Sequence, residues 1–129
     1  MEFTLVCKAH AVVAWFFGLV FLASSFGYAL PWIGPDSLIV AWADGGKALT
    51  YTERYLAGVQ FGLGYWEWIM ADQEKAKDVF VRFHIVLSIL VIYASIEGAV
   101  GWLGWLYPLI VVLFTIGGYV GTTGGYSNV

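Results

Sequence analysis

The sequence predicts an all-α protein, an integral membrane four-helix bundle forming a single transmembrane domain over residues 1–129. Hydrophobic residues make up 60% of the chain and charged residues 12%, and the mean hydropathy is +0.79. Four apolar runs have lengths in the range observed for helices that cross a hydrocarbon core of ~30 Å at ~1.5 Å per residue, although the fourth is slightly short for an untilted crossing. We expect the spans at about residues 8–30, 51–71, 79–100 and 105–121.

The first run follows Lys8 and His10 and ends near Leu30. A cleaved signal peptide is the alternative, because the small residues from Gly27 to Ala29 resemble a cleavage site. The run is longer than the ~7–15 apolar residues of a signal peptide, and Lys8 is the only basic residue before it. We therefore expect it to be a retained span.

A long connection from Pro31 to Thr50 follows. Asp36 is a favourable N-cap and the glycines after Asp44 are typical helix stops, which predicts a short helix at about residues 36–44. Trp32 and Trp42 indicate that this helix lies in the membrane interface, and a lid over a cavity is the alternative.

The second span is unusual because it carries polar residues at seven-residue intervals. Glu53, Gln60 and Glu67 share one stripe of the helix, and Arg54 follows Glu53. A charge at the bilayer centre costs up to about 3 kcal/mol, so these groups should face protein, a cavity or the membrane boundary. Glu53 is expected to be solvated at the outer boundary.

Glycines in the same span predict close packing of helices. Gly58 and Gly62 form a small-xxx-small pair, and Gly64 follows. We expect all three to lie at helix contacts, and a Gly62→Leu substitution to disrupt the bundle.

The third span follows a short charged loop, Asp72 to Asp78, and the fourth has Pro108 in its first turn, where a missing N–H costs little. The positive-inside rule places both termini in the cytoplasm, and we expect a bacterial inner membrane. The rule counts the basic residues at each end of the spans. The end with the N-terminus and the loop between the second and third spans has Lys8, Lys75, Lys77 and Arg82, whereas the opposite end has Lys47 and Arg54.

Antiparallel pairing of the second and third spans around that loop predicts two polar contacts. Arg54 would lie level with Glu97, and Glu67 level with His84. We expect an Arg54–Glu97 contact at the outer end, and a contact of Glu67 with His84 or Arg82 at the cytoplasmic end. Together these residues form the predicted polar intramembrane centre, which comprises Arg54, Gln60, Glu67, Arg82, His84 and Glu97.

A metal site is a further hypothesis for the cytoplasmic end. His10, Glu67 and His84 each lie a few residues inside their spans, and two imidazoles with a carboxylate can bind zinc or iron. No HExxH or ExxH spacing supports this set, so the sequence predicts no metal and no cofactor. The sequence favours structural hydrogen bonds and proton-tunable pairs for these side chains.

The run TERYLAGVQFGLGYW, with an arginine four residues before a glycine and then GxxxGxG, resembles the second-span signature of DoxX-like four-helix membrane proteins of mostly unassigned function. The match covers chiefly residues 52–66. The resemblance implies a four-helix bundle and no established substrate. That family often has an arginine late in the third span, where this chain has Glu97.

Composition limits the function classes. The chain has no basic tract, no phosphate-binding glycine loop and no hydrolase triad pattern, so we expect neither nucleic acid nor nucleotide partners. Its short loops favour a structural or accessory subunit that docks on a larger respiratory, photosynthetic or monooxygenase complex in the lipid membrane. The alternative is a small membrane enzyme or carrier that binds a lipid, quinone or isoprenoid at a polar centre around Glu67, His84 and Arg54.

Overall fold

The structure, a computed structural model, describes residues 1–26, 47–97 and 105–123. Over these residues the all-α prediction is confirmed. The helices are α1 (Phe3–Ser25), α2 (Lys47–Met70), α3 (Ala76–Glu97) and α4 (Leu106–Val120). The predicted interfacial helix at about residues 36–44 lies outside the described residues, as do the last residues of the first and third expected spans.

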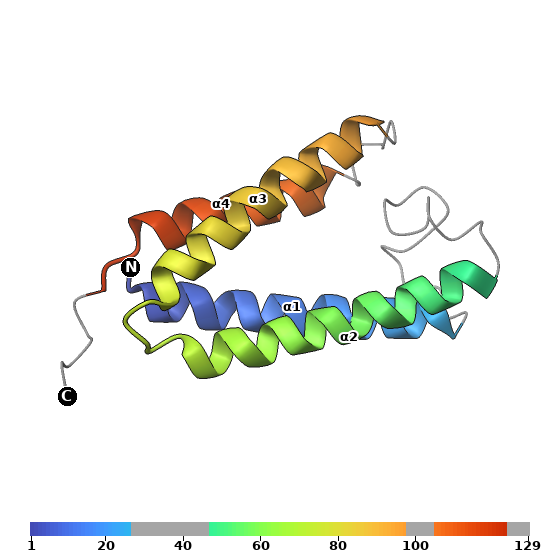
Figure 1. The fold of residues 1–129 in the computed structure, drawn as a ribbon, viewed down its shortest axis with the longest axis horizontal. Coiled ribbons are helices and arrows are strands. Elements are labelled where there is room, and N and C mark those ends of the chain that lie inside the picture. The colour runs from blue at the N-terminus through green and yellow to red at the C-terminus, as the bar shows by residue number, and fades with distance from the viewer. Residues whose placement is uncertain (27–46, 98–104, 124–129) are drawn as a thin grey trace.

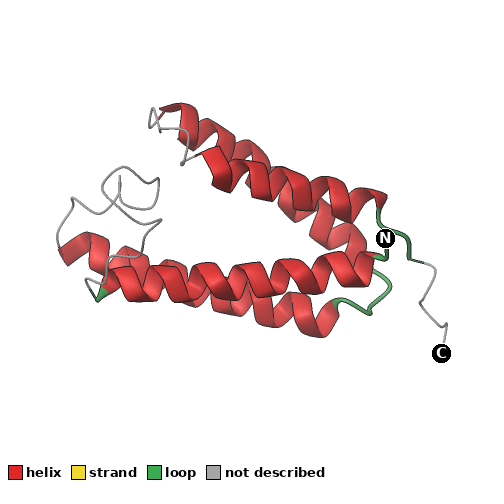
Figure 2. Ribbon diagram, turned by 180° about the vertical axis from the view of Figure 1, so that it is seen from behind, coloured by secondary structure: helices red, strands yellow, loops and turns green. Residues whose placement is uncertain are grey.

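The helices form two hairpins (Figure 1). In one, α1 and α2 run antiparallel, and in the other, α3 packs against α4. The hairpins lie close together at the end that carries the N-terminus and separate toward the opposite end, as the reverse view in Figure 2 also shows. Helix α1 also packs against α4, whereas α2 and α3 have little direct contact although they are consecutive in sequence.

The end where the hairpins meet, called here the joined end, is held by backbone hydrogen bonds between the two ends of the described chain. The Phe3 N–H donates to the Thr122 carbonyl at 3.0 Å, and the Thr122 N–H donates to the Met1 carbonyl at 3.0 Å. Lys77 Nζ donates to the Gly121 carbonyl at 2.6 Å. A cluster of buried side chains fills the same end, formed by Phe3, Val6, Cys7, Ala71, Ala76 and Phe80.

The glycine prediction requires correction at two positions. A Cβ added to Gly58 or Gly62 would meet nothing within 4 Å, so neither glycine lies at a helix contact among the described residues. Gly64 does, because a Cβ there would lie 2.8 Å from the Ala11 carbonyl oxygen and collide with Trp15. The reason is helical geometry: Gly64 is four residues from Gln60 and shares its face, whereas Gly58 and Gly62 are two residues away on the other side.

Two of the helices, α1 and α3, are long and apolar enough to cross a membrane. Core helices of soluble proteins pass the same test, but only 22% of the most apolar stretch of α3 is buried. The outer face of α3 exposes large apolar side chains along most of its length, with Arg82 near its start. They include Val79, Phe83, Val86, Ile89, Leu90, Tyr93 and Ile96.

Candidate functional site

Three ionisable side chains from three helices meet in the interior, and we call them the His–Glu–His cluster. They are His10 of α1, Glu67 of α2 and His84 of α3. Glu67 and His84 are 0% exposed and His10 is 5% exposed. The structure thus brings together three residues that the sequence could place only at a common depth.

The Glu67 carboxylate lies against the His10 ring. His10 Nδ1 is 2.9 Å from Glu67 Oε1 and 2.8 Å from Oε2. His84 lies on the other side of His10, with the two Nε2 atoms 3.2 Å apart. His84 Nε2 is also 3.8 Å from Glu67 Oε1, so the expected proximity of Glu67 and His84 is present in the structure.

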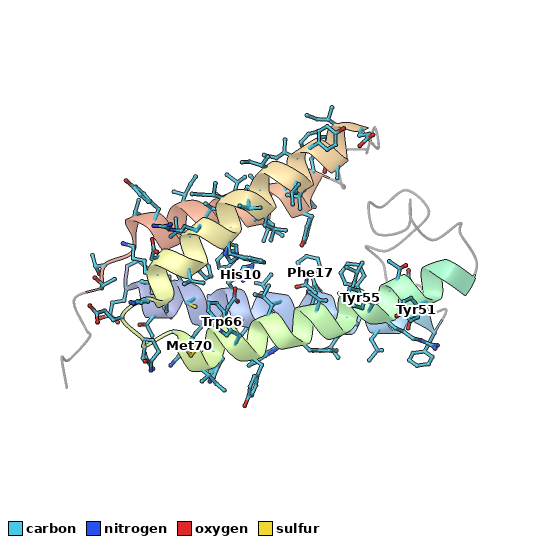
Figure 3. All side chains as sticks on the ribbon, viewed as in Figure 1. His10, Phe17, Tyr51, Tyr55, Trp66 and Met70 are labelled. Carbon is cyan, nitrogen blue, oxygen red and sulfur yellow. The ribbon has the colours of Figure 1, made fainter. Side chains whose placement is uncertain are left out.

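Each side chain reaches this point because of its depth in its helix. His10 is seven residues from the start of α1, Glu67 three from the end of α2 and His84 eight from the start of α3. At ~1.5 Å per residue these offsets correspond to about 5–12 Å along the helix axes. Because all three helix ends lie at the joined end, the cluster lies just inside it, and Figure 3 shows His10 between α1 and the α3–α4 hairpin.

The hydrogen-bond partners determine where the protons lie. His84 Nδ1 is 2.8 Å from the Phe80 carbonyl, which can only accept, so Nδ1 bears the hydrogen and Nε2 of neutral His84 is a lone pair. An ionised Glu67 also only accepts, so His10 Nδ1 bears the hydrogen and Nε2 of neutral His10 is a lone pair too. Two lone pairs 3.2 Å apart cannot bond to each other.

When Glu67 is ionised, the cluster therefore requires one additional proton or a metal ion. One solution is a proton on His10 Nε2, because this N–H then donates to the lone pair of His84 Nε2. A proton on Glu67 has the same effect, because the acid then donates to His10 Nδ1 and the His10 Nε2–H donates to His84. A metal ion between the two Nε2 atoms is the other solution.

Aromatic rings surround the cluster. Phe80 stacks on His84 with ring centroids 3.9 Å apart, and Phe114 meets the His10 ring edge-on at 4.8 Å. Such a shell excludes water and strengthens electrostatic interactions inside it. His10 also lines a cavity of about 10 Å³, enough for roughly one water molecule, into which Gln60 and Tyr107 face.

The remaining members of the predicted polar centre lie elsewhere. Arg54 donates from Nε to Ser25 Oγ at 3.3 Å, and its guanidinium lies 4.6 Å from the centre of the Phe26 ring. Glu97 is exposed at the far end of α3. No Arg54–Glu97 ion pair occurs among the described residues, because α2 and α3 diverge from their shared turn instead of pairing along their length.

Arg82 is also outside the cluster. Its Nε donates to Asp78 Oδ1 at 2.9 Å, one turn earlier on α3, and both side chains are well exposed. The contact expected of Glu67 is therefore made with the histidines and not with Arg82.

The polar stripe of α2 faces inward, and this includes a residue that the sequence analysis placed in solvent. Glu53 is only 5% exposed and accepts a hydrogen bond from Ser24 Oγ at 2.8 Å. Its seven-residue spacing from Gln60 was the signal for this position. A second polar contact that the sequence did not indicate joins Ser88 of α3 to Thr115 of α4 at 3.0 Å.

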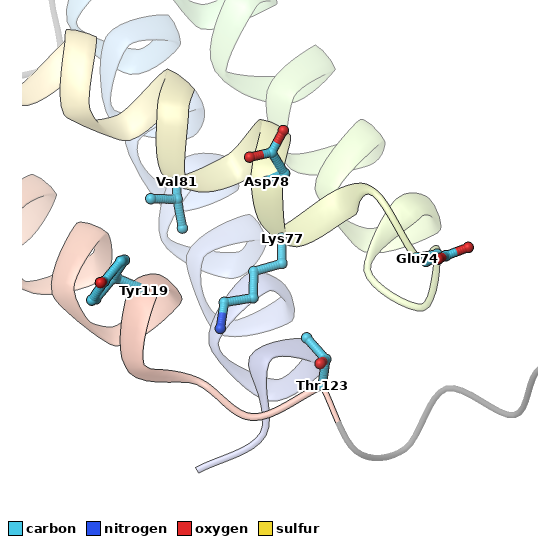
Figure 4. A pocket seen from close by; sticks show the side chains of 6 residues that line it. All are labelled: Glu74, Lys77, Asp78, Val81, Tyr119 and Thr123. Carbon is cyan, nitrogen blue, oxygen red and sulfur yellow. The ribbon is translucent and has the colours of Figure 1, made fainter.

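A separate surface pocket of about 600 Å³ lies between the start of α3 and the end of α4 (Figure 4). Lys77 crosses it toward Gly121, so its ammonium is engaged by the backbone. The residues that line the pocket are Glu74, Lys77, Asp78, Val81, Tyr119 and Thr123.

No protein-family model, curated protein or solved structure matches the chain. The resemblance to the DoxX-like family therefore stays a prediction.

Proposed function

We propose that the chain is an integral membrane protein whose four helices cross the bilayer, and that it is a small membrane enzyme or carrier with the His–Glu–His cluster as its cation-binding centre. The apolar outer face of α3 supports the membrane location. A soluble protein of this size rarely exposes so extended an apolar surface.

One observation carries the choice of centre: the two Nε2 atoms face each other at 3.2 Å while the other nitrogen of each ring is already engaged. A purely structural network would be fully satisfied by its own groups. With Glu67 ionised, this one is satisfied only when it also holds a proton or a metal ion. Both histidines of the chain take part, although 74 positions separate them.

Nitrogen-15 NMR of the full chain in lipid nanodiscs tests the centre. Because the chain has two histidines, the spectrum contains two imidazoles. In metal-free protein at neutral pH we expect one hydrogen-bonded Nε2–H in a His10–His84 pair. Two neutral rings whose Nε2 atoms are both unprotonated would overturn the proposal.

Two glutamine substitutions in α2 test whether Glu67 specifically stabilises the proton shared by the histidines. Glu67→Gln retains an oxygen acceptor for His10 but removes the charge that compensates the cation, so the bound proton should be lost more readily. Glu53→Gln alters the other buried carboxylate of α2, well away from the histidines, and should leave both imidazole signals unchanged. An equal effect of both substitutions would contradict a specific role of Glu67.

The second candidate is the accessory subunit, and the exposed apolar face of α3 favours it. That face is suited to another membrane helix as well as to lipid. Native electrophoresis after extraction in a mild detergent separates the two candidates. Co-migration with a larger assembly supports the subunit, and migration as a free chain with an intact cluster supports the enzyme or carrier.

A further inference from the structure

We propose that the cation bound by the His–Glu–His cluster is a divalent transition metal, with zinc as the reference ion, held by the Nε2 atoms of His10 and His84. This inference rests on the proposed function, because it identifies the cation of the same centre.

The spacing of the two nitrogens already suits a metal. Zinc–nitrogen bonds are about 2.0–2.1 Å, so two nitrogens on a tetrahedral zinc ion lie about 3.3 Å apart. His10 Nε2 and His84 Nε2 are 3.2 Å apart. The separation of the two nitrogens therefore already matches that of two ligands on one zinc ion.

The opposite nitrogen of each ring is fixed as it is in metal-binding histidines. Such residues donate their second N–H to a carboxylate or a backbone carbonyl, which sets the tautomer and the ring orientation. His10 donates from Nδ1 to Glu67, and His84 donates from Nδ1 to the Phe80 carbonyl. The Nε2 atoms of both neutral rings thus stay free to act as metal ligands.

Glu67 contributes the compensating charge. A divalent ion in an apolar interior requires a nearby anion, and Glu67 is the carboxylate of the only group of three metal-ligating side chains that converges within the described parts of the chain. The ligand atoms of this group lie within 4.8 Å of one another. Glu67 can therefore orient His10 or turn an oxygen to the ion as a third ligand.

A small cavity lies beside His10, although neither Glu67 nor His84 lines it. It has room for about one water molecule and contains Gln60 and Tyr107 as polar neighbours. A metal with protein ligands and one open position is the arrangement of catalytic zinc sites, whereas structural sites are closed by four protein ligands. Imidazole ligands favour zinc, copper, iron or nickel over magnesium and calcium.

The test uses the full chain purified in detergent and stripped of metal. Titration with Zn²⁺ in a calorimeter should give one ion per chain, and Co²⁺ should give the intense visible absorption of a four-coordinate site. Magnesium should not compete. Absence of stoichiometric Zn²⁺ binding to helical, monodisperse protein would overturn the inference.

Substitutions test whether the zinc ion binds at the His–Glu–His cluster. His84→Phe keeps an aromatic ring against Phe80 and removes a ligand, so stoichiometric binding should be lost. Glu67→Gln should weaken binding about 10–100-fold, the usual effect of losing a partner that orients a metal ligand. Glu53→Gln is the matched control and should bind like the unaltered chain. Undiminished binding by folded His84→Phe would refute the assignment.

The outcomes also separate this inference from the proposed function. If no metal binds but NMR finds the shared Nε2 proton, the cation is a proton and only the metal assignment fails. If neither is found, the cation-binding centre fails as well.

Discussion

Replacing Gly64 by alanine should destabilise the fold, because the added methyl group would enter the contact between α1 and α2. The new Cβ would lie 2.8 Å from the Ala11 carbonyl oxygen, which belongs to the backbone of α1 and cannot rotate away. An ordinary contact needs at least 3.4 Å, so the helices must separate locally. Overpacking of this kind costs about 1–3 kcal/mol.

Gly62→Ala is the matched control two residues away. The methyl group at Gly62 would meet nothing within 4 Å, and alanine is favoured over glycine in a helix by up to about 1 kcal/mol. The same gain offsets part of the loss at Gly64, so we expect the two variants to differ by about 2 kcal/mol in the free energy of unfolding.

Thermal unfolding followed by circular dichroism in one detergent provides the measurement. For a chain of this length a difference of 2 kcal/mol corresponds to about 5–10 °C in the unfolding midpoint. Gly64→Ala should unfold below the unaltered chain, and Gly62→Ala at or above it. Equal midpoints for the two variants would show that α1 and α2 do not pack through Gly64.

Three further substitutions test other contacts. Gly118→Ala would place a Cβ 2.7 Å from the Phe80 ring that stacks on His84, so it should lower the thermal midpoint and shift the His84 NMR signals; an unchanged His84 spectrum would contradict that contact. Ser24→Ala should cost about 1–3 kcal/mol because it leaves the buried Glu53 carboxylate without its donor, and chemical unfolding that matches the unaltered chain would argue against the bond. Arg82→Gln should change stability by less than about 0.5 kcal/mol because its pair with Asp78 is exposed, and a larger loss in the same assay would mean that Arg82 has a buried partner.

The all-α class and the inward direction of the polar stripe could be predicted from the sequence. Seven residues are close to two helical turns, so Glu53, Gln60 and Glu67 had to share one face, and burial of a charged face against protein follows from its cost in lipid. The same stripe contained the information about glycine packing. Once it faces inward, Gly64 must face inward and Gly62 must face outward.

The angle between the hairpins could not be predicted from the sequence. Counting residues outward from the turn between α2 and α3 gives the depth of each side chain, but it assumes that the two helices stay in contact. They diverge, so the depth match of Glu67 with His84 near the turn corresponds to a contact, and the match of Arg54 with Glu97 far from it does not. That His10 would lie between Glu67 and His84 depended on the packing of α1, which helical periodicity alone does not determine.

The hairpins diverge from the joined end, and the His–Glu–His cluster lies just inside that end. His10 and Glu67 belong to one hairpin and His84 to the other. The contact between the two imidazoles therefore connects the hairpins close to the joined end. A small change in the distance between the two imidazoles would therefore correspond to a larger change in the distance between the hairpins at their far ends.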